Sequence, residues 1–179
     1  MDKVFTNRYE IKYIVPTRSL AYIRNSLMGL IVPDSFNIGE KGYYNYSIYF
    51  DTLTYRFYRE KHEGLLYRIK PRIRVYRDTL DGKISRVFLE FKIKHDRIEK
   101  KERTEITQNM MRQILSGSSE YIEKENELNS DPIIRRFYSL TKRYYLKPKV
   151  VVYYKRSAFY SELYPNVRIT FDSNLRGSL

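Results

Sequence analysis

The 179-residue chain contains no cysteine, only two histidines, and few glycines (7) and prolines (6). Without cysteine it can form neither disulfides nor thiolate metal sites, and it has no cysteine nucleophile. The N-terminus lacks the apolar core of a signal peptide, and no apolar run approaches the roughly 18 residues of a membrane span. These absences predict a cytoplasmic domain without a membrane segment of its own, which could still work beside a membrane-associated partner.

Positive charge and aromatic residues are abundant instead. Lysine and arginine number 34 against 21 acidic residues, a formal net charge of +13. Such an excess predicts an acidic partner, which could be a phosphate chain, a nucleotide, a nucleic acid or an anionic membrane surface. The 19 tyrosines and 9 phenylalanines argue against disorder and favour a strand-rich fold. The length fits one domain, residues 1–179.

Alternating and helical patterns divide the chain into short elements. The clearest signal is a pair of alternating runs, 66–76 and 83–94, joined through the hairpin turn pair Asp81-Gly82. Thr17, Asp51 and Thr107 are expected to cap the helices that follow them, and Asp172 to end a strand. Strands are predicted over 8–15, 43–50, 66–76, 83–94, 101–106, 149–160 and 166–172, and helices over 17–30, 53–61, 107–116 and 131–140.

Charged side chains recur on one face of these strands, because successive strand residues point to opposite faces. Arg68, Lys70, Arg72 and Arg74 would stand about 6.6 Å apart along one face. A single strand of this kind fits an ordinary sheet with one wet face. Repetition over several strands, with Glu10, Glu90 and Glu105 interspersed, favours a shared charged interior. The pattern therefore predicts an α+β fold in which an antiparallel β-tunnel carries helices on its outside.

Six segments, in order and covering nearly the whole chain, resemble the VTC domain. This is the polyphosphate polymerase domain of the vacuolar transporter chaperone complex, within the CYTH or triphosphate tunnel metalloenzyme superfamily. Each segment alone is a weak motif, whereas the six together are specific. They are Arg8-Tyr-Glu-Ile-Lys-Tyr13, Ser47-Ile-Tyr-Phe-Asp-Thr52, Lys70-Pro-Arg-Ile-Arg-Val-Tyr76, Leu89-Glu-Phe-Lys-Ile-Lys94, Tyr154-Lys-Arg-Ser-Ala-Phe159 and Val167-Arg-Ile-Thr-Phe-Asp172.

The resemblance implies a tunnel of eight antiparallel strands that binds triphosphate or polyphosphate, with Mn²⁺ or Mg²⁺ held by a carboxylate. The VTC branch transfers the γ-phosphoryl group of ATP to a growing polyphosphate chain, and other branches hydrolyse triphosphates or cyclise ATP. Carried over by motif, the catalytic residues are Arg72, Arg74, Arg156 and Arg168. Further phosphate-binding residues are Lys12, Lys70, Lys92, Lys94 and Arg103, and the metal ligands are Glu90 and Glu10, unless these two only pair with neighbouring cations.

Two departures from the family pattern bear on activity. Arg8-x-Glu10-x-Lys12 stands where the wider superfamily has Glu-x-Glu-x-Lys, which favours the VTC branch over the triphosphatases and leaves fewer metal ligands. The family also has a last strand, with a metal-binding Glu, after the segment that matches Val167 to Asp172. We find no such strand before Leu179. The expectation is therefore seven strands, with an eighth missing through truncation, supplied by a neighbouring molecule, or absent from an open tunnel.

Three functional hypotheses follow. A polyphosphate polymerase that uses ATP leads. A non-catalytic polyphosphate or nucleotide binder is the alternative, and an inorganic triphosphatase is the runner-up among enzymes. A nucleic-acid binder ranks last, because the cations alternate inward on strands instead of forming an external stripe.

Overall fold

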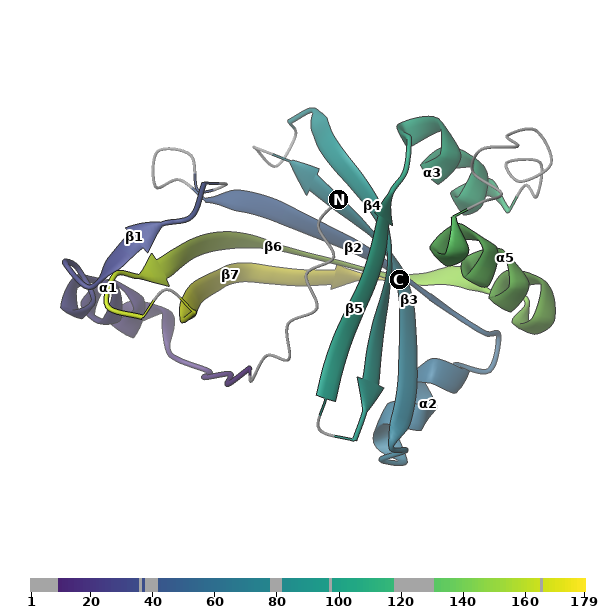
Figure 1. The fold of residues 1–179 in the computed structure, drawn as a ribbon, viewed down its shortest axis with the longest axis horizontal. Helices are drawn as coiled ribbons and strands as arrows, with labels where there is room; N and C mark the ends of the chain where they lie inside the picture. The colour runs from purple at the N-terminus through teal and green to yellow at the C-terminus, as the bar shows by residue number, and fades with distance from the viewer. Residues whose placement is uncertain are drawn as a thin grey trace.

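The computed structural model describes residues 10–35, 37, 42–77, 82–96, 98–117, 131–164 and 166–179. Within them, seven strands form one antiparallel sheet, accompanied by four helices (Figure 1). The strands are β1 (Ile31–Pro33), β2 (Tyr43–Asp51), β3 (Tyr67–Arg77), β4 (Ile84–His95), β5 (Ile98–Glu105), β6 (Lys147–Ser161) and β7 (Arg168–Ser178). The helices are α1 (Thr17–Ser26), α2 (Arg56–His62), α3 (Gln108–Ser116) and α5 (Pro132–Tyr144).

The longest strand, β6, organises the sheet. One of its edges pairs with β7, and the other pairs first with β2 and then, near the end of β6, with β1. From β2 the sheet continues through β3 and β4 to β5. It curls into a half-barrel whose two outer strands are β7 and β5 (Figure 1). The antiparallel α+β fold is confirmed, whereas eight strands and a closed tunnel stay predictions.

Three helices, α2, α3 and α5, cover the convex face of the half-barrel, whereas α1 lies beside β1 (Figure 1). Phe137 of α5 packs edge-on against Phe50 of β2, with ring centroids 5.1 Å apart, and also contacts Phe91 of β4. Met110 and Ile114 of α3 join the same apolar core. Burying one such side chain contributes about 1.5–3 kcal/mol, so this layer supplies most of the hydrophobic stabilisation.

Capping side chains set where α2, α3 and α5 begin, as the sequence predicts, whereas α1 follows Pro16 without the side-chain cap expected from Thr17. The Thr107 hydroxyl accepts a hydrogen bond from the Met110 amide at the start of α3, which ends at Gly117 in a left-handed conformation. Asp131 caps α5 in the same way. The carboxylate of Asp51 accepts hydrogen bonds from the Phe57 and Tyr58 amides, both at 3.0 Å, and so confirms the predicted cap of α2.

The N-terminal part differs from the expectation. A strand was expected over 8–15, but residues 10–16 have no regular secondary structure, and residues 1–9 lie outside the described part. Alternation produces a strand only where a neighbour supplies backbone hydrogen bonds, and no described strand pairs with this segment. The helix expected over 17–30 ends at Ser26, and Ile31–Pro33 forms β1 instead, which is too short for periodicity to reveal.

Some predictions concern residues outside the described part. The turn residues 78–81 and the segment 118–130 lie outside it, although the β3–β4 register confirms the hairpin. None of the described helices is long and apolar enough to cross a membrane.

Gly42, just before β2, has a φ of +70°, and a side chain there would overlap the carbonyl oxygen of Arg156 in β6.

Candidate functional site

The strand register collects the predicted basic residues on the concave face of the half-barrel. Arg72 is opposite Tyr49 of β2, and along β2 the same face leads to Tyr43, which is opposite Arg156 of β6. Arg156 in turn is opposite Asp172 of β7. The concave face, as we use the name, comprises Tyr43, Asn45, Ser47 and Tyr49 of β2, Lys70, Arg72 and Arg74 of β3, Glu90, Lys92 and Lys94 of β4, Glu99, Lys101 and Arg103 of β5, Tyr154 and Arg156 of β6, and Arg168 and Asp172 of β7.

Arg72 and Glu90 form a buried ion pair at the centre of this face. Arg72 is 9% exposed and Glu90 is fully buried. Two guanidinium nitrogens of Arg72 donate to Glu90 Oε2 at 2.9 and 2.7 Å, and a third donates to the Tyr49 hydroxyl at 3.0 Å. Desolvation alone would raise the pKa of Glu90, but Arg72, Lys101 and Arg74 outweigh it, so the pKa is lowered and the carboxylate stays ionised.

Arg74 lies one pleat further along β3 and is 7% exposed. It donates to the Tyr154 hydroxyl at 3.2 Å, and its guanidinium stands over the rings of Tyr76 and Tyr154. Its buried Nε has no hydrogen-bond partner, and neither has the buried Oε1 of Glu90. Buried polar atoms are normally satisfied, so both atoms mark places where a bound molecule or water can make contacts.

Lysines extend the positive charge toward the end of the face where β3 begins. Lys92 pairs with Glu99 at 2.8 Å, and both Lys92 and Lys94 lower the pKa of Glu99. The pKa of Lys70 is lowered by burial and by repulsion from Lys61, Lys92 and Arg68, although Tyr49 opposes this. A lysine held among cations in this way favours an anion in its vicinity.

Residues of β5 contribute two further cations. The pKa of Lys101 is lowered to about 8, because the concave face desolvates it and Arg103, Arg72 and Arg74 repel it, while Glu90 opposes the shift. The Lys101 side chain is nevertheless open to solvent on one side. Arg103 is also open and stacks over the Phe88 ring at 4.6 Å. The same positive field lowers the pKa of Tyr49: burial would raise it, but Arg72 outweighs this.

Two ion pairs hold the arginines on the β6–β7 side. Arg156 makes a bidentate contact with Asp172, at 2.6 and 2.7 Å. Arg168 donates to Asp34, a buried carboxylate just after β1. Asp172 was expected to end a strand, which is wrong, because β7 continues to Ser178. It continues past a bulge at Asn174, whose positive φ interrupts the alternation on which the prediction rested.

Lys12 and Glu10 lie elsewhere than predicted. Both are exposed, in the irregular segment before α1, and they pair with each other at 3.4 Å. Neither projects from a strand of the sheet, so the placement that the first-strand motif predicted is wrong. Lys12 nevertheless lowers the pKa of Glu99, which places it within electrostatic reach of β5.

The carboxylates do not assemble a metal centre within the described residues. No group of three or more His, Cys, Asp or Glu side chains occurs there that could hold an ion. Glu90 does have a buried oxygen without a partner, but Arg72, Arg74 and Lys101 surround it. These residues do not fit a divalent ion held by the protein alone. A requirement for Mn²⁺ or Mg²⁺ stays a prediction.

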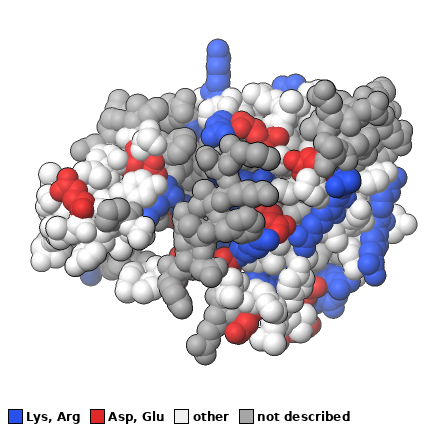
Figure 2. All heavy atoms as spheres, in the orientation of Figure 1, with Lys and Arg blue, Asp and Glu red and all other residues white. Residues whose placement is uncertain are grey.

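Figure 2 shows lysine and arginine side chains beside acidic ones in the middle of the view, over the strands of the half-barrel. Some of the site's residues were not among the predicted ones. Tyr154 shares the strand parity of Arg156 and Lys101 that of Arg103, so the sequence did contain a signal for these two. Tyr49 had none, because β2 carries no lysine or arginine. Asp34 had no such signal, because it is 134 positions from its partner Arg168.

The comparisons with known proteins agree with this architecture. A family model, the VTC domain, matches residues 7–179. Since the match covers nearly the whole chain, the protein belongs to the VTC domain family. No curated protein matches the sequence.

Proposed function

We propose that the concave face binds a chain of linked phosphates, and that the domain transfers the γ-phosphoryl group of ATP to a growing polyphosphate chain. Family membership and the charge of the face support the proposal together. The observation that carries it is the pair Arg72 and Arg74, two buried guanidinium groups on one strand that face the hollow side of the sheet.

The contacts around these arginines suit phosphoryl transfer. Phosphoryl transfer requires little covalent chemistry from a protein and depends on positioning and on neutralising charge as it develops. Glu90 and Tyr49 hold the guanidinium of Arg72, and Tyr154 holds that of Arg74. Because these groups are fixed before a ligand arrives, less reorganisation is needed when phosphate oxygens bind.

Charge balance explains how the free protein tolerates such a face. An isolated buried ion costs several kcal/mol, and Glu90, Asp172 and Asp34 reduce this cost by pairing with Arg72, Arg156 and Arg168. Lys70 and Lys101 are left with mostly cationic neighbours. A polyanion would therefore meet its strongest unbalanced charge near these two lysines.

Synthesis is tested directly by incubating the protein with ATP and either Mn²⁺ or Mg²⁺, and separating the products on a gel. The proposal expects a ladder of phosphate chains that Arg74→Met reduces at least tenfold. Arg135→Gln is the matched control, since Arg135 is exposed on α5, away from the concave face. If wild-type protein binds polyphosphate but gives no ladder with either metal, the transfer step is refuted and binding stands.

A second candidate function is polyphosphate or nucleotide binding without turnover. The observation that favours it is the lack of a carboxylate group for a metal among the described residues. It predicts that polyphosphate binds equally well with EDTA and with Mn²⁺. Release of orthophosphate from tripolyphosphate would identify a triphosphatase instead. Binding to single-stranded nucleic acid that short polyphosphate cannot displace would contradict all three.

A further inference from the structure

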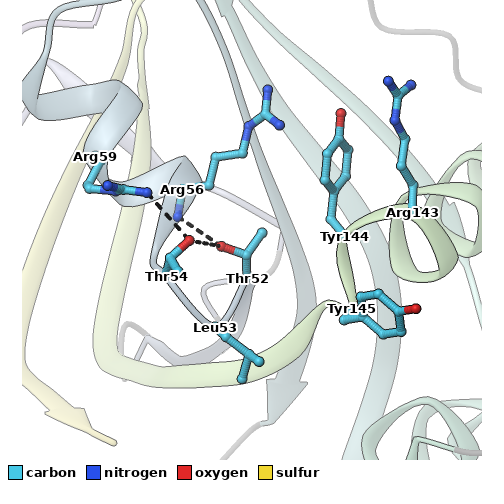
Figure 3. Close-up of a pocket in the computed structure, with 8 residues that line it drawn as sticks. All are labelled: Thr52, Leu53, Thr54, Arg56, Arg59, Arg143, Tyr144 and Tyr145. Atoms are coloured by element: carbon cyan, nitrogen blue, oxygen red, sulfur yellow. Dashed lines mark hydrogen bonds between the residues drawn. The ribbon is translucent and has the colours of Figure 1, made fainter.

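A second basic pocket lies outside the concave face, between the start of α2 and the end of α5 (Figure 3). Its volume is about 510 Å³, which is within the range of small-molecule sites. The helices that form it cover the convex side of the sheet (Figure 1). The pocket is therefore a separate site, and the polyphosphate proposal does not assign it a role.

In the described part of the chain, the lining of this pocket includes three arginines and no acidic residue. Among the described residues, Arg59 and Arg143 have no carboxylate partner, and Arg59 only contacts the Thr54 hydroxyl, at 3.4 Å. Arg56 is paired through its Nε with Glu60, which lies outside the lining. The pocket thus presents an excess of positive charge.

Two of these arginines, Arg56 and Arg143, stack on the ring of Tyr144. The guanidinium of Arg56 lies 4.7 Å from the centroid of its ring, and that of Arg143 lies 5.3 Å from it. In Figure 3 the Arg56 and Arg143 side chains flank the Tyr144 ring, and all three point the same way. Two guanidinium groups that flank one ring and point the same way present their N–H donors to the same side, where an anionic group can bind.

The opposite end of the pocket is apolar. Leu53 and the ring of Tyr145 lie there, away from the tips of Arg56 and Arg143 (Figure 3). Tyr55, just before α2, and Tyr145, just after α5, have left-handed backbone conformations, with φ of 55° and 52°. Non-glycine residues uncommonly adopt this conformation, which is over-represented at functional sites, although at Tyr145 it also ends α5 in the usual way for a helix.

We propose that this pocket binds a nucleoside monophosphate or a closely similar phosphorylated compound with a planar apolar part. The phosphate group lies between Arg56 and Arg143 near the Tyr144 hydroxyl, and the planar part packs between Leu53 and Tyr145. The amides at the start of α2 are not needed, because Asp51 and Thr52 already cap them.

The experiment separates this site from the concave face by saturating the protein with long-chain polyphosphate first. AMP, adenosine and inorganic pyrophosphate are then titrated by calorimetry, against wild type and three variants. Arg56→Gln/Arg143→Gln removes the two cations, and Leu53→Glu places a carboxylate in the pocket; all three positions are exposed, so folding should be retained. Arg135→Gln removes an exposed cation of α5 that does not line the pocket.

We expect AMP to bind the saturated wild type and the Arg135→Gln control alike. Its affinity should fall at least tenfold in Arg56→Gln/Arg143→Gln and in Leu53→Glu. Absence of AMP binding, or binding that both pocket variants retain, would overturn the proposal. The proposal would also be overturned if adenosine or pyrophosphate bound as tightly as AMP. The pocket would then not recognise both the phosphate and the planar part of the ligand. None of these outcomes bears on whether the concave face binds polyphosphate.

Discussion

Neighbouring residues on the two faces of one sheet can be buried almost equally and yet lie in different chemical surroundings. Ile73 and Arg74 are neighbours on β3, and they are 0% and 7% exposed. Ile73 points into the apolar core beneath the helices, whereas Arg74 points into a layer of hydroxyl groups, aromatic rings and ions. Burial therefore does not separate a core residue from a residue of the proposed site here. The chemistry of the neighbours does.

The comparison also separates stability from function. Apolar contacts on the convex face stabilise the fold in proportion to the area they bury. Buried ion pairs such as Arg72–Glu90 are weak contributors to stability, because desolvation of the charges offsets their attraction. Stability therefore does not account for the ions of the concave face, and the following changes test the proposal that they bind an anion.

The largest effect is expected on the convex face. Phe137→Ala would remove a fully buried ring and lower the free energy of unfolding by about 4 kcal/mol. Urea denaturation measures this loss. At a temperature where the variant is folded, its affinity for polyphosphate should equal that of wild type. A parallel loss of affinity would show that the two faces are not independent.

Glu90→Gln should be nearly as destabilising, by about 3 kcal/mol, because Arg72 loses its charged partner while buried. The pKa of Glu90 is lowered from 4.5, so in wild type the pair's contribution is present above pH 4.5 and lost as pH falls through the lower, folded pKa. Thermal melts should show tripolyphosphate stabilising the variant more than wild type. Equal stabilisation of both proteins would contradict an anion site at Arg72.

Arg74→Met should leave the fold largely intact, since only the contact with the Tyr154 hydroxyl and ring packing are lost. Losing a charge-assisted contact to phosphate costs about 1.5–3 kcal/mol, which predicts at least a tenfold weaker affinity for polyphosphate. Fluorescence anisotropy with labelled polyphosphate measures it. Tyr154→Phe, which only frees the guanidinium, should have a smaller effect, and the reverse order would be inconsistent with direct contact.

Lys101 gives the smallest effect, and a pH-dependent one. Its pKa is lowered to about 8, so the free protein loses this charge as pH rises through about 8. A bound polyanion should raise this pKa and keep Lys101 protonated. Affinity should fall roughly threefold between pH 7 and pH 9, as expected for one partly screened charge. Lys101→Arg, which stays protonated, should flatten that part of the profile. An unchanged profile would remove Lys101 from the site.

Much of this architecture could be predicted because local chemistry determines it. Strand parity placed Arg72, Arg156 and Arg168 on one face before their partners were known, and the register confirms it. The caps at Asp51 and Thr107 were likewise predicted, because a capping side chain acts on amides a few residues away.

Long-range pairing was harder to predict, for physical reasons. The segment before α1 has the alternation of a strand but no described partner strand. The local sequence cannot show whether a partner strand is available. β1 has three residues, and its pairing with β6 depends on contacts more than 120 positions away. The ion pair between Arg168 and Asp34 is invisible for the same reason.

Gly42 provides a way to deform the concave face without altering its charge. Its positive φ disfavours any other residue, and even a methyl group would press on the carbonyl oxygen of Arg156. Gly42→Ala would push the backbone that carries this guanidinium away from its neighbour strand, so that Arg156 is misplaced while every ionisable group remains. Such a variant would reveal how far recognition depends on shape, as distinct from electrostatic attraction alone.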